Sequence, residues 1–243
     1  MRGILLAAGP GRRLHPLTAD LPKTLLPLAG GRTILDLVLS NLSSVGIEDV
    51  TVVAGFAAER LAERALAFER RHGVRIELVV NDRAEEWNNA YSLWLARDAF
   101  GDGALLVNGD TAHPVAVEER LLAAQRADVL LAVDDEKRLG TEEMKIVLSE
   151  DGKLRRISKG VDPATAAGEY IGVALIQPAA ARPLADALEA TWRRDPSLYY
   201  EDGFQEFADR GGQVGIAPIG SVEWVEVDDQ ADLERAREIE FRS

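Results

Sequence analysis

The sequence contains no cysteine, and only three of its 243 residues are histidines. Without cysteine, disulfide bonds and thiolate metal sites are excluded, and this composition suits a reducing cytoplasm. His15, His72 and His113 are scattered and form no motif, so we expect each of them to be structural. The chemistry of this chain is therefore expected to depend on carboxylates, lysines and arginines.

An excess of basic charge and long apolar runs are also missing. The sequence has 28 lysines and arginines against 41 acidic residues, a net charge of −13. This charge argues against nucleic acid or an anionic membrane as a partner, because both favour a basic face. No apolar run is long enough to cross a bilayer, and the first is interrupted too early for a signal peptide. We therefore expect a cytoplasmic protein that contacts neither.

Apolar segments of strand length alternate with amphipathic segments of helix length, which predicts an α/β protein. Strands are expected at residues 3–8, 49–54, 75–80, 104–108, 129–133, 145–148, 153–157, 170–176 and 222–227, and helices at 33–45, 57–71, 90–99, 117–125, 178–192, 198–210 and 230–239. The β-α units at the start of the chain imply a parallel sheet with right-handed connections. Asp151-Gly152 predicts the turn of a hairpin.

The loop after the first strand has the residues of a phosphate site. Gly9 and Gly11 follow the apolar segment 3–8, and Arg12, Arg13 and Lys23 come next. Glycines let backbone N–H groups approach an anion closely, and the basic side chains add full positive charge. A dinucleotide-binding loop is a weaker interpretation because the third glycine is missing, and a P-loop is excluded because no Gly-Lys-Ser/Thr follows.

Two aspartates end predicted strands, where ligands gather in α/β sheets. Asp110 follows the strand at 104–108, and Asp228 follows the segment 222–227. Either aspartate suits Mg²⁺, but Asp110 also fits an Asx turn and Asp228 a helix N-cap. Asp229 is an alternative cap for the last helix, so the choice between these two neighbours stays open.

Several fixed elements of the N-terminal segment occur together in a family of enzymes. The run Leu5-Leu6-Ala7-Ala8-Gly9-x-Gly11-x-Arg13-Leu14, then Pro16-Leu17-Thr18 and Leu21-Pro22-Lys23, resembles the signature of the nucleotidyltransferase superfamily that includes sugar-1-phosphate nucleotidylyltransferases. Asn81-Asp82, Asn88-Asn89-Ala90-Tyr91-Ser92 and Gly168-Glu169-Tyr170-Ile171-Gly172 narrow the resemblance to small cytidylyltransferases for phosphocholine, aminoethylphosphonate or inositol phosphate.

The resemblance implies the architecture as well. We expect a Rossmann-like, mixed but mostly parallel sheet with helices on both faces and a small β-hairpin or lid region. One domain is expected over residues 1–243, with a nucleotide-binding half up to residue 133 and an acceptor-binding half from residue 134. A homodimer is compatible with the sequence.

The same resemblance assigns residues to roles. Lys23 and Arg13 are the expected catalytic cations, and Asp110 and Asp228 the expected metal ligands. The expected nucleotide-binding residues are Leu6, Ala7, Ala8, Gly9, Gly11, Arg12, Arg13, Asn81, Asn88, Asn89 and Ser92, and the expected acceptor-binding residues are Lys145, Lys159, Glu169, Tyr170, Tyr200, Glu201 and Trp224. Asn88 and Asn89 equally suit helix capping, and the lysines equally suit a solvated surface.

The implied reaction joins CTP, or another nucleoside triphosphate, to a small phosphorylated acceptor with Mg²⁺ and releases pyrophosphate. A phosphomonoester is largely dianionic at neutral pH, so no general base is needed. Aromatic and acidic residues in the second half favour a cationic head group such as choline, although core packing or a polyol acceptor explains them too. The alternatives are an inositol-1-phosphate or hexose-1-phosphate nucleotidylyltransferase and a non-catalytic nucleotide-sugar sensor.

Overall fold

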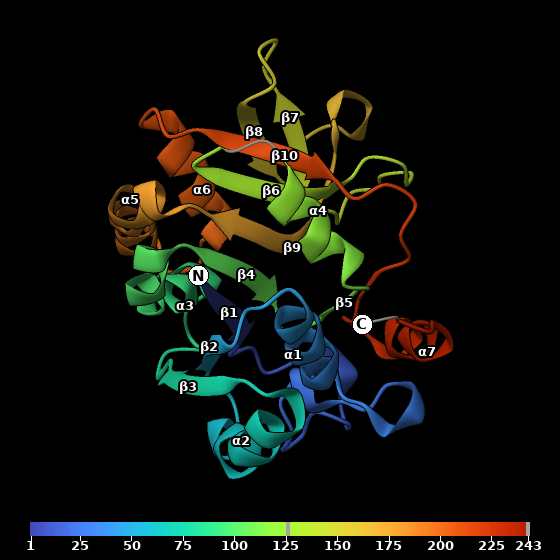
Figure 1. Cartoon of the computed structure of the whole chain (residues 1–243). Coiled ribbons are helices and arrows are strands. Elements are labelled where there is room, and N and C mark those ends of the chain that lie inside the picture. Colours follow the sequence, from blue (N-terminus) through green and yellow to red (C-terminus); the bar gives the residue numbers. More distant parts are fainter. Residues whose placement is uncertain (125–126, 242–243) are drawn as a thin grey trace.

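The computed structural model describes residues 1–124 and 127–241, which form one central sheet covered by helices (Figure 1). The strands of the sheet lie in the order β10, β6, β9, β4, β1, β2, β3. Their bounds are β1 Arg2–Ala7, β2 Asp49–Ala54, β3 Arg75–Val80, β4 Ala104–Asn108, β6 Val129–Asp134, β9 Gly168–Ile176 and β10 Val214–Pro218. Neighbouring strands are parallel except at β9, which is antiparallel to β4 and β6. The predicted fold class, a mixed and mostly parallel sheet, is confirmed.

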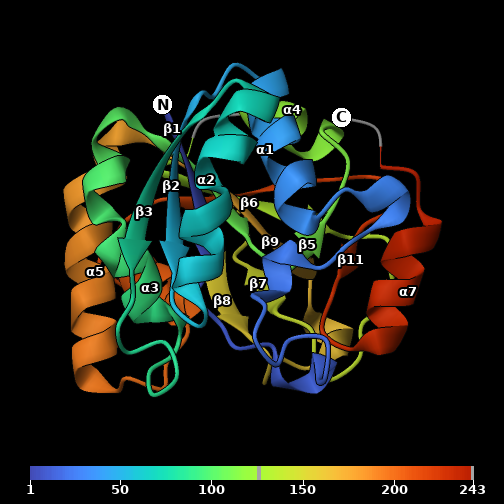
Figure 2. The ribbon, with the colours of Figure 1, turned by 90° about the horizontal axis from the view of Figure 1, so that it is seen from below.

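Helices cover both faces of this sheet because its central strands are apolar on both sides, whereas the edge strand β3 carries exposed Arg75 and Glu77. One face packs against α3 Asn89–Leu95, α5 Ala181–Arg194 and α6 Tyr200–Asp209, and the other against α1 Ile34–Ser44, α2 Ala58–His72 and α4 Ala116–Ala123. The helix α7 Gln230–Glu238 packs in a third apolar cluster, beside the loop that follows β1. Seen from below, α5 and α7 lie on opposite sides of the molecule (Figure 2).

Two further strand pairs complete the fold. The hairpin β7 Lys145–Leu148 and β8 Leu154–Ser158 turns at Gly152, as predicted, and β7 also pairs with the start of β9. The two-residue strands β5 Thr111–Ala112 and β11 Val225–Glu226 pair antiparallel with each other. In Figure 1 the hairpin projects from one end of the sheet, and α2 lies beyond the other.

Some predicted bounds were wrong. The segment 222–227 forms a strand only at β11, and the helix predicted at 90–99 ends at Leu95, before a 3₁₀-helix at Arg97–Asp102. The predicted end of the helix 117–125 lies outside the described residues. The edge strand β10 was missed because Gly215 and Pro218 weaken its pattern, although proline is tolerated at the end of an edge strand. None of the helices in the described ranges has the length and apolar character needed to cross a membrane.

Candidate active site

The glycine loop is open where a phosphate would approach. Gly11 takes a left-handed conformation, with φ of 58°, and caps a 3₁₀-helix at Arg12–Leu14. The buried Thr18 hydroxyl donates to the Gly11 carbonyl at 2.8 Å and fixes the turn. A Cβ on Gly9 would meet no atom within 4 Å. The backbone of Gly9 therefore faces free space.

Four side chains form one ion-pair network beside this loop. The Lys23 ammonium donates to Asp110 Oδ2 at 3.0 Å and to Asp228 Oδ1 at 2.9 Å. Arg13 donates to the other oxygen of Asp228 at 2.6 Å. Burial alone would lower the pKa of Lys23, but the two carboxylates raise it above its ordinary value. Lys23 is therefore a fixed cation at any working pH.

Strand pairing brings the acidic residues together. Thr111 of β5 pairs with Glu226 of β11, and the Val227 N–H donates to the Asp110 carbonyl at 2.8 Å. One carboxylate oxygen from each of Asp110, Glu226 and Asp228 lies within 4.8 Å of the others. Asp110 Oδ1 is buried and has no hydrogen-bond partner among residues 1–124 and 127–241. We call these residues the carboxylate trio; its oxygens are ligands of the kind that Mg²⁺ prefers.

Asp229 has a different role from Asp228. Its side chain accepts from the Asp232 N–H at 3.0 Å and forms the capping box of α7. The Asp228 side chain is thereby left to face Asp110, so the two neighbouring aspartates divide the capping and site positions between them.

Glu226 was missed by sequence reasoning. Residues 226 and 228 alternate along an extended segment, and alternate residues share a face, which is the signal that identifies it. Desolvation within the site, followed by the charges of Asp110 and Asp228, raises the pKa of Glu226 to about 8, although part of the side chain stays open to solvent. Binding of a divalent cation would favour its ionised form.

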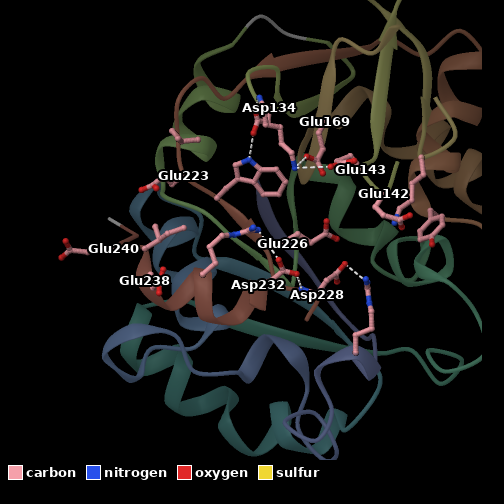
Figure 3. Close-up of a pocket in the computed structure, with 18 residues that line it drawn as sticks. Asp134, Glu142, Glu143, Glu169, Glu223, Glu226, Asp228, Asp232, Glu238 and Glu240 are labelled. Atoms are coloured by element: carbon pink, nitrogen blue, oxygen red, sulfur yellow. Dashed lines mark hydrogen bonds and ion pairs between the residues drawn. The ribbon is translucent and has the colours of Figure 1, made fainter. Parts of the chain in front are cut away.

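Two cavities meet at the trio. We call the smaller one, of about 280 Å³, the inner pocket, and the larger one, of about 870 Å³, the outer groove. Both are lined by Arg13, Glu142, Lys159, Tyr199, Glu226 and Asp228. Figure 3 shows the outer groove, with Glu226 and Asp228 in one part and Asp134, Glu143 and Glu169 in another.

The end of β1 with its following loop and the segment 88–92 form one wall of the inner pocket. Leu6, Ala8, Gly9, Asn88, Asn89 and Ser92 line it, whereas Ala7, Gly11 and Arg12 do not line either cavity. Asn88 is the N-cap of α3 and also lines the inner pocket, so this residue caps the helix and borders the cavity at once. Asn81 is buried behind the wall and donates to the Ser92 hydroxyl at 2.8 Å. Its contact is therefore with the wall and not with the cavity.

The expected acceptor residues divide between the two cavities. Tyr170 and Glu201 line the inner pocket, and Tyr200 is packed behind it with its hydroxyl on Tyr170 and Asn108. Burial raises the pKa of Glu201 to about 8, and its Oε2 has no hydrogen-bond partner within the described ranges. Hydrogen bonding with Tyr200 and the charge of Lys159 oppose this rise in pKa, and the carboxylate has one oxygen that is free to accept from a ligand.

Glu169 and Trp224 line the outer groove instead, and Lys159 lies over the Tyr199 ring where the cavities meet. Lys145 is fully buried, and its ammonium donates to the carbonyls of Thr141 and Glu143. Lys145 is thus apart from both cavities, and its expected role in acceptor binding stays a prediction. Asn108 and Lys137 border the cavities without having been expected to do so.

Similar proteins of known function indicate the family to which this chain belongs. A 3-aminopropylphosphonate CMP synthase of Streptomyces rubellomurinus is 32% identical over 97% of this chain and 38% of that protein. A bifunctional IPC transferase and DIPP synthase of Aquifex aeolicus is 27% identical over 96% of this chain and 50% of that protein. This chain therefore spans half or less of the length of these relatives.

Solved structures share the fold along the whole chain. The inositol-1-phosphate CTP transferase of T. maritima superposes with a TM-score of 0.81 at 21% identity, covering 100% of this chain and 98% of that one. The CTP:phosphocholine cytidylyltransferase of Streptococcus pneumoniae gives 0.75 at 22% identity, covering 98% and 97%. Residues 2–138 match the model of one enzyme family, and the expectation from the motifs is confirmed: the chain belongs to the nucleotidyl transferase family.

Proposed function

We propose that this protein is an Mg²⁺-dependent cytidylyltransferase, which joins CTP to a small phosphate or phosphonate acceptor with a compact cationic head group and releases pyrophosphate. The observation that carries the proposal is one continuous arrangement. The carboxylate trio, whose aspartates are paired with Lys23 and Arg13, lines the same inner pocket as Glu201, whose buried Oε2 has no hydrogen-bond partner in the described ranges. Relatives named for CTP and phosphonate chemistry support the same class.

The trio fits a hard divalent cation. Asp110, Glu226 and Asp228 offer oxygen ligands within 4.8 Å of one another, and the buried Asp110 Oδ1 lacks any partner in the described part of the chain. A bound Mg²⁺ would neutralise charge on the α-phosphate and the acceptor oxygen. Lys23 and Arg13 already pair with the two aspartates of the trio, and both cations are close enough to the metal ligands to meet the phosphates.

The reaction needs alignment more than proton transfer. An oxygen of the acceptor dianion attacks the α-phosphorus, a new P–O bond forms, and the bond to the β-phosphate breaks so that pyrophosphate leaves. The open Gly9 backbone, Arg13 and Lys23 would neutralise the phosphates as this charge moves. The absence of a histidine from the two cavities agrees with a mechanism that needs no base.

The base and the head group would occupy neighbouring parts of the inner pocket, because the Asn89 side chain accepts from the N–H of Tyr200, the residue before Glu201. Asn88 and Asn89 line this pocket, and the hydrogen-bonding capacity of their amides that Ser197 and Tyr200 do not use would meet a pyrimidine edge. Beside this wall, the Glu201 carboxylate and the Tyr170 ring would receive an ammonium group.

A substrate panel tests the proposal. Pyrophosphate release is measured for CTP, UTP, ATP and GTP against 2-aminoethylphosphonate, 2-aminoethyl phosphate, phosphocholine, inositol-1-phosphate and glucose-1-phosphate. We expect CTP with an aminoalkyl acceptor to react fastest. A tenfold advantage for inositol or glucose phosphate would contradict the cationic head group, and a preference for UTP would contradict the base. Nucleotide binding without turnover for any pair would favour the sensor alternative.

A further inference from the structure

The outer groove contains an ammonium-binding arrangement that the protein fills with its own side chain. Lys137 lies in the segment between β6 and β7, and its ammonium lies 2.6 Å from Glu169 Oε2 and 3.8 Å from Glu143 Oε1. The same nitrogen lies 5.2 Å from the centre of the Trp224 ring. An aromatic face with two carboxylates is what an organic cation favours.

The groups around this ammonium are held in place. The Trp224 indole N–H donates to Asp134 Oδ2 at 2.8 Å, and the Glu169 side chain is only 5% exposed. Glu143 accepts from the Gly140 N–H at 2.9 Å. The Lys137 side chain is 38% exposed, far more than that of Glu169, so it lies on the open side of this arrangement, which we call the cage.

We propose that Lys137 is a specificity-determining residue: a tethered cation that occupies the groove's ammonium site and thereby disfavours acceptors whose bulky cationic head group must enter the groove. A compact aminoalkyl head group reaches Glu201 in the inner pocket and does not compete with Lys137. A quaternary head group too large for that position has to displace it. This inference rests on the proposed function for its consequence on acceptor choice.

The alternative is that Lys137 only neutralises the buried Glu169. Neutralisation predicts that losing the ammonium destabilises the protein and affects all acceptors alike. Competition predicts a selective gain for bulky cationic acceptors, because the emptied cage then binds their head group. The two interpretations are separated by comparing a charged with an uncharged head group.

The test uses Lys137→Met, which keeps an apolar stem over Trp224, with Lys137→Arg as the matched control and Lys137→Gln as a second uncharged variant. KM is measured at pH 8 with saturating CTP. We expect Lys137→Met to lower KM for phosphocholine at least tenfold and to leave KM for inositol-1-phosphate within twofold, while Lys137→Arg resembles the wild type. Equal changes for both acceptors, or none, would overturn the assignment.

A binding measurement does not depend on catalysis. Calorimetric titration with choline chloride should detect millimolar binding to Lys137→Met, much weaker binding to the wild type, and a loss of the gain in Lys137→Met/Glu169→Gln. Equal choline binding by the wild type and Lys137→Met would overturn the proposal. If all variants lack transferase activity but this contrast persists, the proposed function fails and the cage assignment stands.

Discussion

The carboxylates that line the inner pocket differ in their partners between the part expected to bind phosphates, which we call the phosphate end, and the part expected to bind the acceptor head group, which we call the head-group end. At the phosphate end, the carboxylates of Asp110 and Asp228 are hydrogen-bonded to Lys23, and Asp228 also to Arg13. At the head-group end, Glu201 has an oxygen without a partner in the described ranges, and burial raises its pKa to about 8. The two aspartates of the phosphate end are thus bonded to cations before any ligand arrives, although Glu226 adds a third carboxylate there, whereas the contacts of Glu201 leave one of its oxygens without a partner in the described ranges.

The difference indicates what each end does. Paired, closely spaced charges resist rearrangement and are suited to stabilising charge that develops during the reaction. A buried carboxylate with an unpaired oxygen instead gains from any cation that reaches it, which gives binding and selectivity. Substitutions at the phosphate end should therefore lower turnover, and substitutions at the head-group end should raise KM.

The largest effect is expected at the carboxylate trio. Asp110→Asn and Asp228→Asn should each abolish metal-dependent pyrophosphate release, because a neutral amide is a poor ligand for a hard cation. Asp229→Asn is the matched control, since its amide oxygen can still accept from the Asp232 N–H and preserve the cap. If Asp229→Asn is the inactive variant, the assignment of Asp228 is wrong.

A large but incomplete loss is expected when a phosphate-end cation is removed. Lys23→Ala should lower kcat by about 10²- to 10³-fold, the usual consequence of losing one preorganised group that stabilises developing charge. Lys153→Ala, at the exposed tip of the hairpin, removes the same charge far from the site. Steady-state kinetics with folding checked by circular dichroism measures both. A folded Lys23→Ala with near-normal kcat would show that this end does not set the rate.

The phosphate end could be predicted from the sequence because its residues occur in short, ordered motifs. Gly9, Arg13 and Lys23 lie within one loop, and Asp110 follows a strand whose burial is evident from its composition. The parallel β-α units were predicted for the same reason: their periodicity is local. Glu226 also has a local signal, its alternation with Asp228.

The head-group end depends on distant pairings that leave no local pattern. Tyr170 and Tyr200 are 30 residues apart and meet only because β9 inserts between β4 and β6 while α6 packs on that face. Lys137 reaches Glu169 through the same insertion, since β6 and β9 pair antiparallel. The sequence indicated aromatic and acidic residues here, but not that they would divide between two cavities.

A moderate effect on affinity is expected at the head-group end. Glu201→Gln should raise KM for 2-aminoethyl phosphate by about 10- to 100-fold, the loss of one buried charge-assisted hydrogen bond, with a smaller change in kcat. Asp202→Asn is the control, because it removes a neighbouring charge while its amide oxygen can still accept from the Tyr199 N–H. Equal KM values for the two variants would mean that Glu201 does not bind the ammonium group.

The smallest effect is expected from a change of pH. It sharpens the comparison because only the head-group end should change the preference for an aminoalkyl acceptor over inositol-1-phosphate. Glu201 binds an ammonium group when ionised, and its pKa is raised to about 8, so kcat/KM for 2-aminoethyl phosphate should rise with pH. Between pH 7 and 9 the ionised fraction of such a group rises about tenfold, while an acceptor amine with a pKa near 10 stays mostly protonated. The kcat/KM for 2-aminoethyl phosphate is divided by the kcat/KM for inositol-1-phosphate at each pH, which removes changes at the phosphate end, including those of Glu226.

Glu201→Gln should make this ratio independent of pH. A ratio that rises equally in the variant would assign the titration to another group.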